Sequence, residues 1–295
     1  MPFTLSHAAA VLPVLRRTGT ARGPLVASAL VAGSFAPDMT YYADSLIPGA
    51  MAFGEVTHAP SGALTVDVLV TVALVGGWLL VREPLIALLP RAWQSPVHTL
   101  VRGRLRRPRG LRQLLTAAAW FVVSAVLGAT THVVWDAFTH PGRWGTRLVP
   151  GLDQVVGGLP VYTFVQYGTS ALAAAALGWF GWSALRGRGG GARGGVASGD
   201  AASGTAAIPV LTVRLRLLLT APVVLCVLAG AVHRVVRAYA VLGPTVHWLG
   251  YLPTVLFGAG AGLILGLVLY GAAARLVHRR TCRTGTARDG ATGHG

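Results

Sequence analysis

The sequence contains no lysine, and only nine of its 295 residues are acidic. Charged residues make up 12% of the chain, whereas hydrophobic residues make up 53% and the mean hydropathy is +0.60. A water-soluble domain needs more polar surface than this composition supplies. The scarcity of charge therefore argues against a soluble fold and predicts an integral membrane protein.

Other common features are also missing. There are two cysteines: Cys226 lies in an apolar stretch and Cys282 in an arginine-rich tail, so we expect free thiols and neither a disulfide nor a zinc finger. The sequence lacks a glycine-rich phosphate loop, a serine-nucleophile elbow and a long internal repeat. These absences disfavour nucleotide-binding folds and serine hydrolases.

Long apolar segments are abundant, and five of them have about 16 to 24 residues, close to the roughly 20 that cross a bilayer. They are 63–81, 114–134, 162–185, 217–232 and 251–274. Two shorter apolar pieces, 8–15 and 24–36, lie on either side of Arg16 and Arg17 and predict a helical hairpin. The expected fold is all-α: a polytopic helical membrane protein with five full transmembrane helices and a short N-terminal hairpin.

The segment 186–207 interrupts this pattern. It is rich in glycine, serine and alanine, a composition typical of a flexible linker. It divides the chain into an N-terminal part, 1–185, with the hairpin and three spans, and a C-terminal part, 208–295, with two spans and a basic tail.

Arginine orients the spans. Of the 25 arginines, 21 fall in segments that alternate onto one side of the membrane, and four fall on the other: Arg143, Arg147, Arg234 and Arg237. Because arginine favours the cytoplasmic side, we expect the richer side, including the C-terminus, to be cytoplasmic in a bacterial inner (cell) membrane. The basic charge is then a topology signal, with contact to anionic membrane lipids second and no nucleic-acid partner.

Three polar side chains follow one another at the end of the predicted helix 114–134. His132, Asp136 and His140 are spaced four residues apart, so a helix that continued this far would carry them in one stripe. Imidazole nitrogens and carboxylate oxygens suit zinc and its first-row relatives, and a shared carboxylate can bridge two ions.

Three further candidates reach the same membrane face. The arginines at the bend of the hairpin place His7 beside Asp38 at its open, outer end, and His58 lies in the outer loop before the next span. Six potential ligands therefore converge under a topology that arginine alone determines. Ionisable residues near a bilayer are costly unless they are paired or functional, so this convergence predicts a site.

Each residue also has an ordinary structural explanation. A single histidine at a helix end is more often a hydrogen-bonded interfacial residue than a metal ligand. Asp38 follows Pro37, where it would cap a turn. Asp67 lies in an apolar run, and we favour a structural role for it. Only the joint convergence favours a functional site over these explanations.

Several motifs resemble an uncharacterised bacterial integral-membrane family: MPFTLSH at 1–7, APD at 36–38, TH at 57–58 and the run from TH at 131–132 to HPGRWG at 140–145. That family is more distantly similar to inner-membrane metal-dependent hydrolases, and the order of its His and Asp residues is similar to that in zinc-dependent phospholipase C and related nucleases. The resemblance is clearest over 1–185. It implies that the metal ligands are His7, Asp38, His58, His132 and Asp136, with His140 a further candidate. The sequence has no counterpart for every ligand of a three-zinc site, so the number of ions stays open.

The expected function is therefore a membrane-embedded metal-dependent hydrolase with zinc as the expected cofactor and Asp136 and His140 at its catalytic centre. A bound divalent ion lowers the pKa of its water from about 16 to near 7 and polarises a phosphoryl or carbonyl oxygen. Arg143 and Arg147 would hold an anionic substrate, for which a phosphoester of a lipid or envelope precursor is the natural class. Ordinary interfacial solvation explains the two arginines equally well.

Two other classes remain. A non-catalytic membrane scaffold with a structural metal or a polar cluster would use the same ligand types, and only an open coordination position separates it from an enzyme. A transporter is less favoured, because its polar residues would lie near the midplane, whereas these collect at one face. The sequence leaves the substrate and the oligomeric state open.

Overall fold

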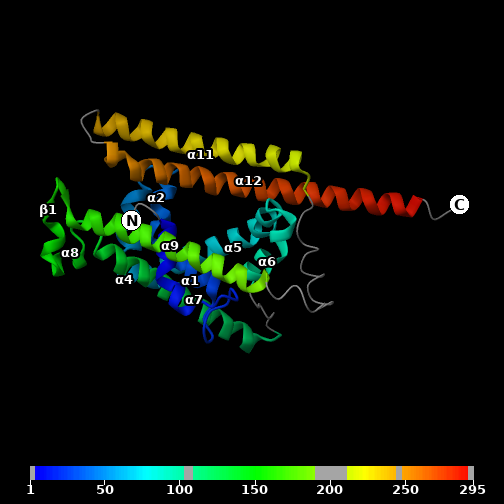
Figure 1. Cartoon of the computed structure of the whole chain (residues 1–295), viewed down its shortest axis with the longest axis horizontal. Coiled ribbons are helices and arrows are strands. Elements are labelled where there is room, and N and C mark those ends of the chain that lie inside the picture. The colour runs from blue at the N-terminus through cyan, green and yellow to red at the C-terminus, as the bar shows by residue number, and fades with distance from the viewer. Residues whose placement is uncertain (1–3, 103–108, 190–210, 244–247, 292–295) are drawn as a thin grey trace.

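The chain is almost entirely helical in the computed structural model drawn in Figure 1. The structure describes residues 4–102, 109–189, 211–243 and 248–291. Short elements come first: η1 (Thr4–Val14), α1 (Ala27–Gly33), η2 (Ala36–Asp38), α2 (Met39–Ala43), η3 (Ala50–Phe53), α3 (Gly54–Thr57) and α4 (Pro60–Leu64). Longer helices follow, with small elements between them: α5 (Val66–Ala87), α6 (Arg91–Arg102), α7 (Leu111–Ala137), α8 (Trp144–Leu148), η4 (Pro150–Asp153), β1 (Val155–Val156), β2 (Leu159–Pro160), α9 (Val161–Gly189), α11 (Val213–Leu242) and α12 (Trp248–Ala291).

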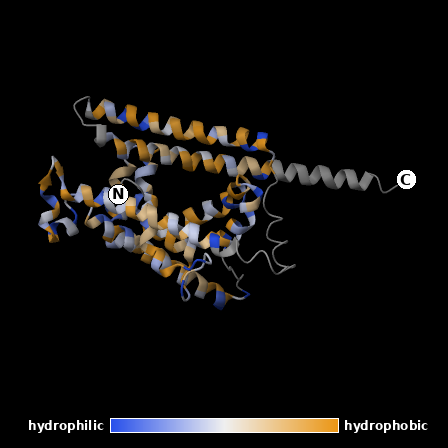
Figure 2. Ribbon diagram, viewed as in Figure 1, coloured by the Kyte–Doolittle hydropathy of each residue, from blue (hydrophilic) through white to orange (hydrophobic). Residues whose placement is uncertain are grey.

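Four helices are long and apolar enough to cross a membrane: Val66–Ala87, Leu111–Ala137, Val213–Val241 and Tyr251–Leu276. Their apolar side chains point outward as well as inward. Leu69 on α5 is 70% exposed and Leu225 on α11 is 65% exposed, and Figure 2 shows hydrophobic residues along the length of α11. Surface of this kind is stable in lipid and not in water. The chain is therefore a multi-pass membrane protein.

The prediction of five full spans is not confirmed. Segment 162–185 does form a helix, α9, but it is not among the four spans found in the described residues. Glycine, serine, threonine and Gln166 interrupt its apolar residues and lower its hydropathy. The predicted linker 186–207 begins inside α9 and otherwise lies outside the described residues.

The N-terminal hairpin takes a different form from two α-helical arms. Residues 4–14 wind as the 3₁₀ helix η1, and Leu15 pairs with Ala21 in an antiparallel bridge that reverses the chain. The return arm is α1, which has seven residues. The hairpin brings Thr4 at its start back beside Asp38, where their side chains hydrogen-bond.

Small residues let α1 lie directly against α7. A Cβ added to Gly128 would lie 2.3 Å from the carbonyl oxygen of Leu30, and one added to Gly33 would lie 2.4 Å from the carbonyl oxygen of Ala125. Only glycine permits backbones to approach this closely, as in other membrane helix pairs. The contact places the segment after α1 beside the last turns of α7.

The C-terminal helices α11 and α12 form an antiparallel pair along one side of the molecule (Figure 1). Gly258 and Gly262, four residues apart on α12, face the backbone of α11. The pair is anchored to the N-terminal part at both ends. Near the candidate site Arg234 forms a buried ion pair with Asp44, and at the other end the hydroxyl of Tyr270 donates to the carbonyl of Pro84 at 2.7 Å.

Candidate metal centre

Four ligand-type side chains from separate parts of the chain meet at one end of the bundle. Asp38 closes η2 just after α1, His58 follows α3, and His132 and Asp136 lie one turn apart near the end of α7. One nitrogen or oxygen from each lies within 4.8 Å of all the others. All four residues are buried, with exposures of 7% or less.

The distances among these atoms fit a single ion. Nε2 of His132 lies 3.4 Å from Oδ1 of Asp38 and 3.4 Å from Oδ2 of Asp136, and Nε2 of His58 lies 3.6 Å from the same two oxygens. Ligand atoms at about 2.1 Å from a tetrahedral zinc ion are separated from one another by about 3.4 Å. The four nitrogen–oxygen distances match this separation, and every pair of the four atoms lies within 4.8 Å.

Both imidazoles are oriented by their second nitrogen. Nδ1 of His132 lies 2.7 Å from the carbonyl oxygen of Ser34, and Nδ1 of His58 lies 2.9 Å from that of Gly54. A carbonyl only accepts, so each Nδ1 carries a proton, and in the neutral imidazole Nε2 then presents its lone pair to the centre. Neither Nε2 has a hydrogen-bond partner among the described residues.

Asp38 is held in a similar way. Its Oδ2 accepts a hydrogen bond of 2.5 Å from the hydroxyl of Thr4, and the hydroxyl of Tyr42 donates to Thr4 at 2.9 Å. This leaves Oδ1 directed toward the two imidazoles. Hydrogen bonds of this kind fix the orientation of metal ligands in known sites.

The charge of the centre also fits a bound cation. With neutral imidazoles, ionised Asp38 and Asp136 bring two negative charges into a buried site, and buried like charges are costly unless a cation balances them. Asp67, in the first turn of α5, is also fully buried, and neither of its oxygens has a hydrogen-bond partner in the described part of the chain. The donor set and its charge fit a divalent cation.

Almost the whole chain matches one protein family. The family described as a domain of unknown function (DUF4184) matches residues 1–272. The chain belongs to this family. The match includes Asp38, His58, His132 and Asp136, so the centre lies within the family's own domain. No curated protein and no solved structure matches the chain.

His7, the fifth predicted ligand, lies next to the group of four and outside it. Its ring stacks on that of His132, with centroids 3.6 Å apart, and its Nε2 lies 3.4 Å from Oδ1 of Asp136, the oxygen that does not face His132. Burial holds the pKa of His7 well below its usual range. His7 is therefore a neutral imidazole on the far side of the Asp136 carboxylate.

His140 lies at the open edge of the centre. Helix α7 ends at Ala137, but the amide of His140 still donates to the carbonyl of Asp136 at 3.1 Å, so His140 stays beside Asp136 as predicted. Its Nδ1 still lies 3.5 Å from Oδ2 of Asp136, and its side chain is 33% exposed. Burial of the ring lowers the pKa of His140 to about 4, so it is neutral at pH 7.

The two predicted substrate arginines differ in position. The charge of Arg143 acts on the hydroxyl of Tyr41, whose ring stacks on His58 with centroids 5.5 Å apart. Arg147 is exposed and donates to the carbonyl of Gly142 at 2.6 Å. Arg143 thus lies beside the centre, whereas Arg147 binds its own loop.

Sequence reasoning missed several residues around the centre. Tyr41 is one, and burial, assisted by the charge of Asp38, raises its pKa to about 12, which keeps it a neutral hydrogen-bond donor. Thr4 and Gln166 are others; the side-chain nitrogen of Gln166 lies 3.2 Å from Nε2 of His140. None of these residue types stands out in an apolar helix or a loop. Asp67 was recognisable in the sequence as an acid in an apolar run, but the sequence did not show that it lies near the centre.

Proposed function

We propose that this chain is a membrane-embedded metal-dependent hydrolase in which Asp38, His58, His132 and Asp136 hold one divalent cation, with zinc the expected ion. The supporting observation is that the nitrogen–oxygen distances among their ligand atoms are 3.4 to 3.6 Å, with each imidazole oriented by a backbone carbonyl. We further propose a bacterial inner membrane as its location and a phosphoester of a lipid or envelope precursor as its substrate.

The surrounding residues suit such a reaction. When bound, a divalent cation supplies a Lewis acid and activates water for attack. Neutral His140, at the exposed edge beside Asp136, is placed to accept a proton. Arg143 is placed to pair with an anionic phosphoester, and the neutral hydroxyl of Tyr41 to donate to one of its oxygens. His7 supports Asp136 from its other side.

The second candidate is a scaffold with a structural ion. Its specific support is that the centre offers four protein ligands, all buried, the number that structural zinc sites use. A hydrolase needs a position for water or substrate, either by expansion to five ligands or by release of one. The exposed edge at His140 favours the hydrolase.

Phosphorus NMR distinguishes the two candidates without knowledge of the substrate. Zinc-loaded protein is reconstituted with a total bacterial lipid and envelope-precursor extract, beside an equal amount of Asp136→Ala protein. A hydrolase produces new phosphate resonances with the wild-type chain only. Identical spectra from the two samples, with zinc bound to the wild type, contradict the hydrolase and leave the structural ion.

Arg143→Ala is expected to raise KM for the substrate so identified by about tenfold, because one charge-assisted hydrogen bond to the phosphoester is lost. Metal content should not change, since Arg143 is not one of the four ligands. Arg147→Ala is the matched control, because its guanidinium is bound to the carbonyl of Gly142. Equal KM values for the two variants would remove Arg143 from the substrate site.

We also propose that the metal centre faces outward, because, with α9 counted as a fifth crossing, 21 of the 25 arginines belong to segments on the opposite side. Single cysteines at Ser61 and Gly110, both exposed positions, test this in a chain lacking Cys226 and Cys282. A membrane-impermeant maleimide applied to intact spheroplasts should label the cysteine at 61 and spare the one at 110. The reverse pattern would show that the orientation is wrong.

A further inference from the structure

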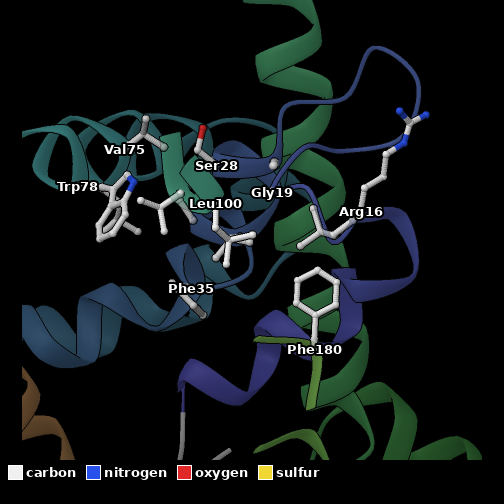
Figure 3. A pocket seen from close by; sticks show the side chains of 14 residues that line it. Arg16, Gly19, Ser28, Phe35, Val75, Trp78, Leu100 and Phe180 are labelled. Atoms are coloured by element: carbon white, nitrogen blue, oxygen red, sulfur yellow. The ribbon is translucent and has the colours of Figure 1, made fainter. Parts of the chain in front are cut away.

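A second, apolar site lies toward the other end of the bundle. It is a cavity of about 420 Å³ between the N-terminal hairpin, α5, α6 and α9. Figure 3 shows Phe35, Trp78, Leu100 and Phe180 around it. A cavity of about 150 Å³ in a soluble protein holds benzene, so this one has room for a considerably larger apolar molecule.

The position of the cavity along α5 shows how deep it lies in the membrane. Leu74 and Trp78 line it from α5, seven and eleven residues beyond Asp67, which places them about 10 and 16 Å further along the helix than the metal centre. Helix α5 has 22 residues and is one of the four membrane-crossing helices. The cavity is therefore at the level of the lipid hydrocarbon, near the middle of α5, and it extends from there to Arg16 and Leu100.

The mouth of the cavity is basic. The stem of Arg16 lines it, and in Figure 3 the guanidinium of Arg16 points away from the apolar interior. Arg22 is exposed on the same turn, and Arg91 and Arg102 are exposed on α6, whose residue Leu100 also lines the cavity. Glu83, an acid at this end, is paired with Arg82 and Arg275. The charge of Arg16 at the mouth, unpaired among the described residues, suits an anionic group of a bound molecule.

We infer that this cavity binds an acyl chain of an anionic phospholipid from the leaflet on the arginine-rich side, with the lipid phosphate against the arginines at the mouth. The apolar interior suits the acyl chain of such a lipid, and the basic rim suits its phosphate group. The bilayer supplies acyl chains at this depth, and filling the cavity with one removes apolar surface from unfavourable contact. This site does not depend on the metal centre or on its proposed chemistry.

Native mass spectrometry of the full chain tests the proposal with phosphatidylglycerol and phosphatidylcholine of the same chain length. After detergent exchange the wild-type protein should retain one phosphatidylglycerol, at least about tenfold more often than phosphatidylcholine. Equal retention of the two lipids, or retention of neither, would overturn the proposal. Metal content of the same samples reports separately on the proposed hydrolase.

Variants on one helix supply the matched comparison. Val75→Trp fills the cavity and should lower phosphatidylglycerol retention by about tenfold, whereas Val72→Trp, on an exposed face of α5 outside the cavity, should retain as much as wild type. Arg16→Gln should reduce the preference for phosphatidylglycerol. Equal retention by Val75→Trp and Val72→Trp contradicts the assignment. If Val75→Trp does not fold, the wild-type lipid ratio and Arg16→Gln decide.

Discussion

Protein carrying Asp136→Ala is expected to lose its bound metal, with content falling more than about 100-fold from about one ion per chain in the wild type. Asp136 supplies the oxygen that lies 3.4 Å from Nε2 of His132 and 3.6 Å from Nε2 of His58. Removing it eliminates one of four ligands and one of the two charges that balance a divalent cation. Elemental analysis of detergent-purified protein measures the change.

Asp153→Ala is the matched control, because Asp153 is an exposed acid in η4, away from the group of four. Both variants should elute as monodisperse protein, so that metal loss is not a consequence of unfolding. Cobalt substitution of the wild type gives a second readout, since a four-coordinate site absorbs strongly in the visible range. Full metal content in Asp136→Ala would show that the ligand set is wrong.

Much of this centre could be predicted because two simple rules apply to it. His132 and Asp136 are four residues apart in a long apolar helix, so they share a face wherever that helix packs. The uneven arginine distribution places the end of that helix, the open end of the N-terminal hairpin and the loop before α5 on one side. Asp38 and His58 then had to approach them, and the structure places them within 4.8 Å.

Other features depend on contacts that no spacing encodes. Nε2 of His140 lies 3.2 Å from the side-chain nitrogen of Gln166, which comes from a separate helix, α9. His7 reaches Asp136 by stacking on His132, a geometry set by the 3₁₀ winding of η1. Arg147 is turned away by a hydrogen bond to the Gly142 carbonyl that involves its own loop. For His7 and Arg147 the local backbone decides the direction of the side chain.

The metal centre also depends on the contact between α1 and α7, which Gly128 makes possible. Gly128 lies one turn before His132 on the same face of α7. Against it lie the carbonyl of Leu30 and the amide of Ser34, and the carbonyl of Ser34 orients His132 through Nδ1 at 2.7 Å. A single close approach between two helices therefore positions both the imidazole and, four residues after Ser34, the carboxylate of Asp38.

Gly128→Val is expected to destabilise the fold by about 1–3 kcal/mol and to weaken metal affinity by about 10- to 100-fold. A Cβ at 128 would lie 2.3 Å from the Leu30 carbonyl oxygen and 2.8 Å from the Ser34 nitrogen. Both are backbone atoms that cannot rotate aside, so α1 must shift. The shift moves the carbonyl of Ser34 away from Nδ1 of His132 and weakens their hydrogen bond. Gly178→Val, in open space on α9, is the matched control and should bind metal like the wild type. Zinc titration of the two folded variants measures the difference. Equal affinities would show that α1 does not set the geometry of the centre.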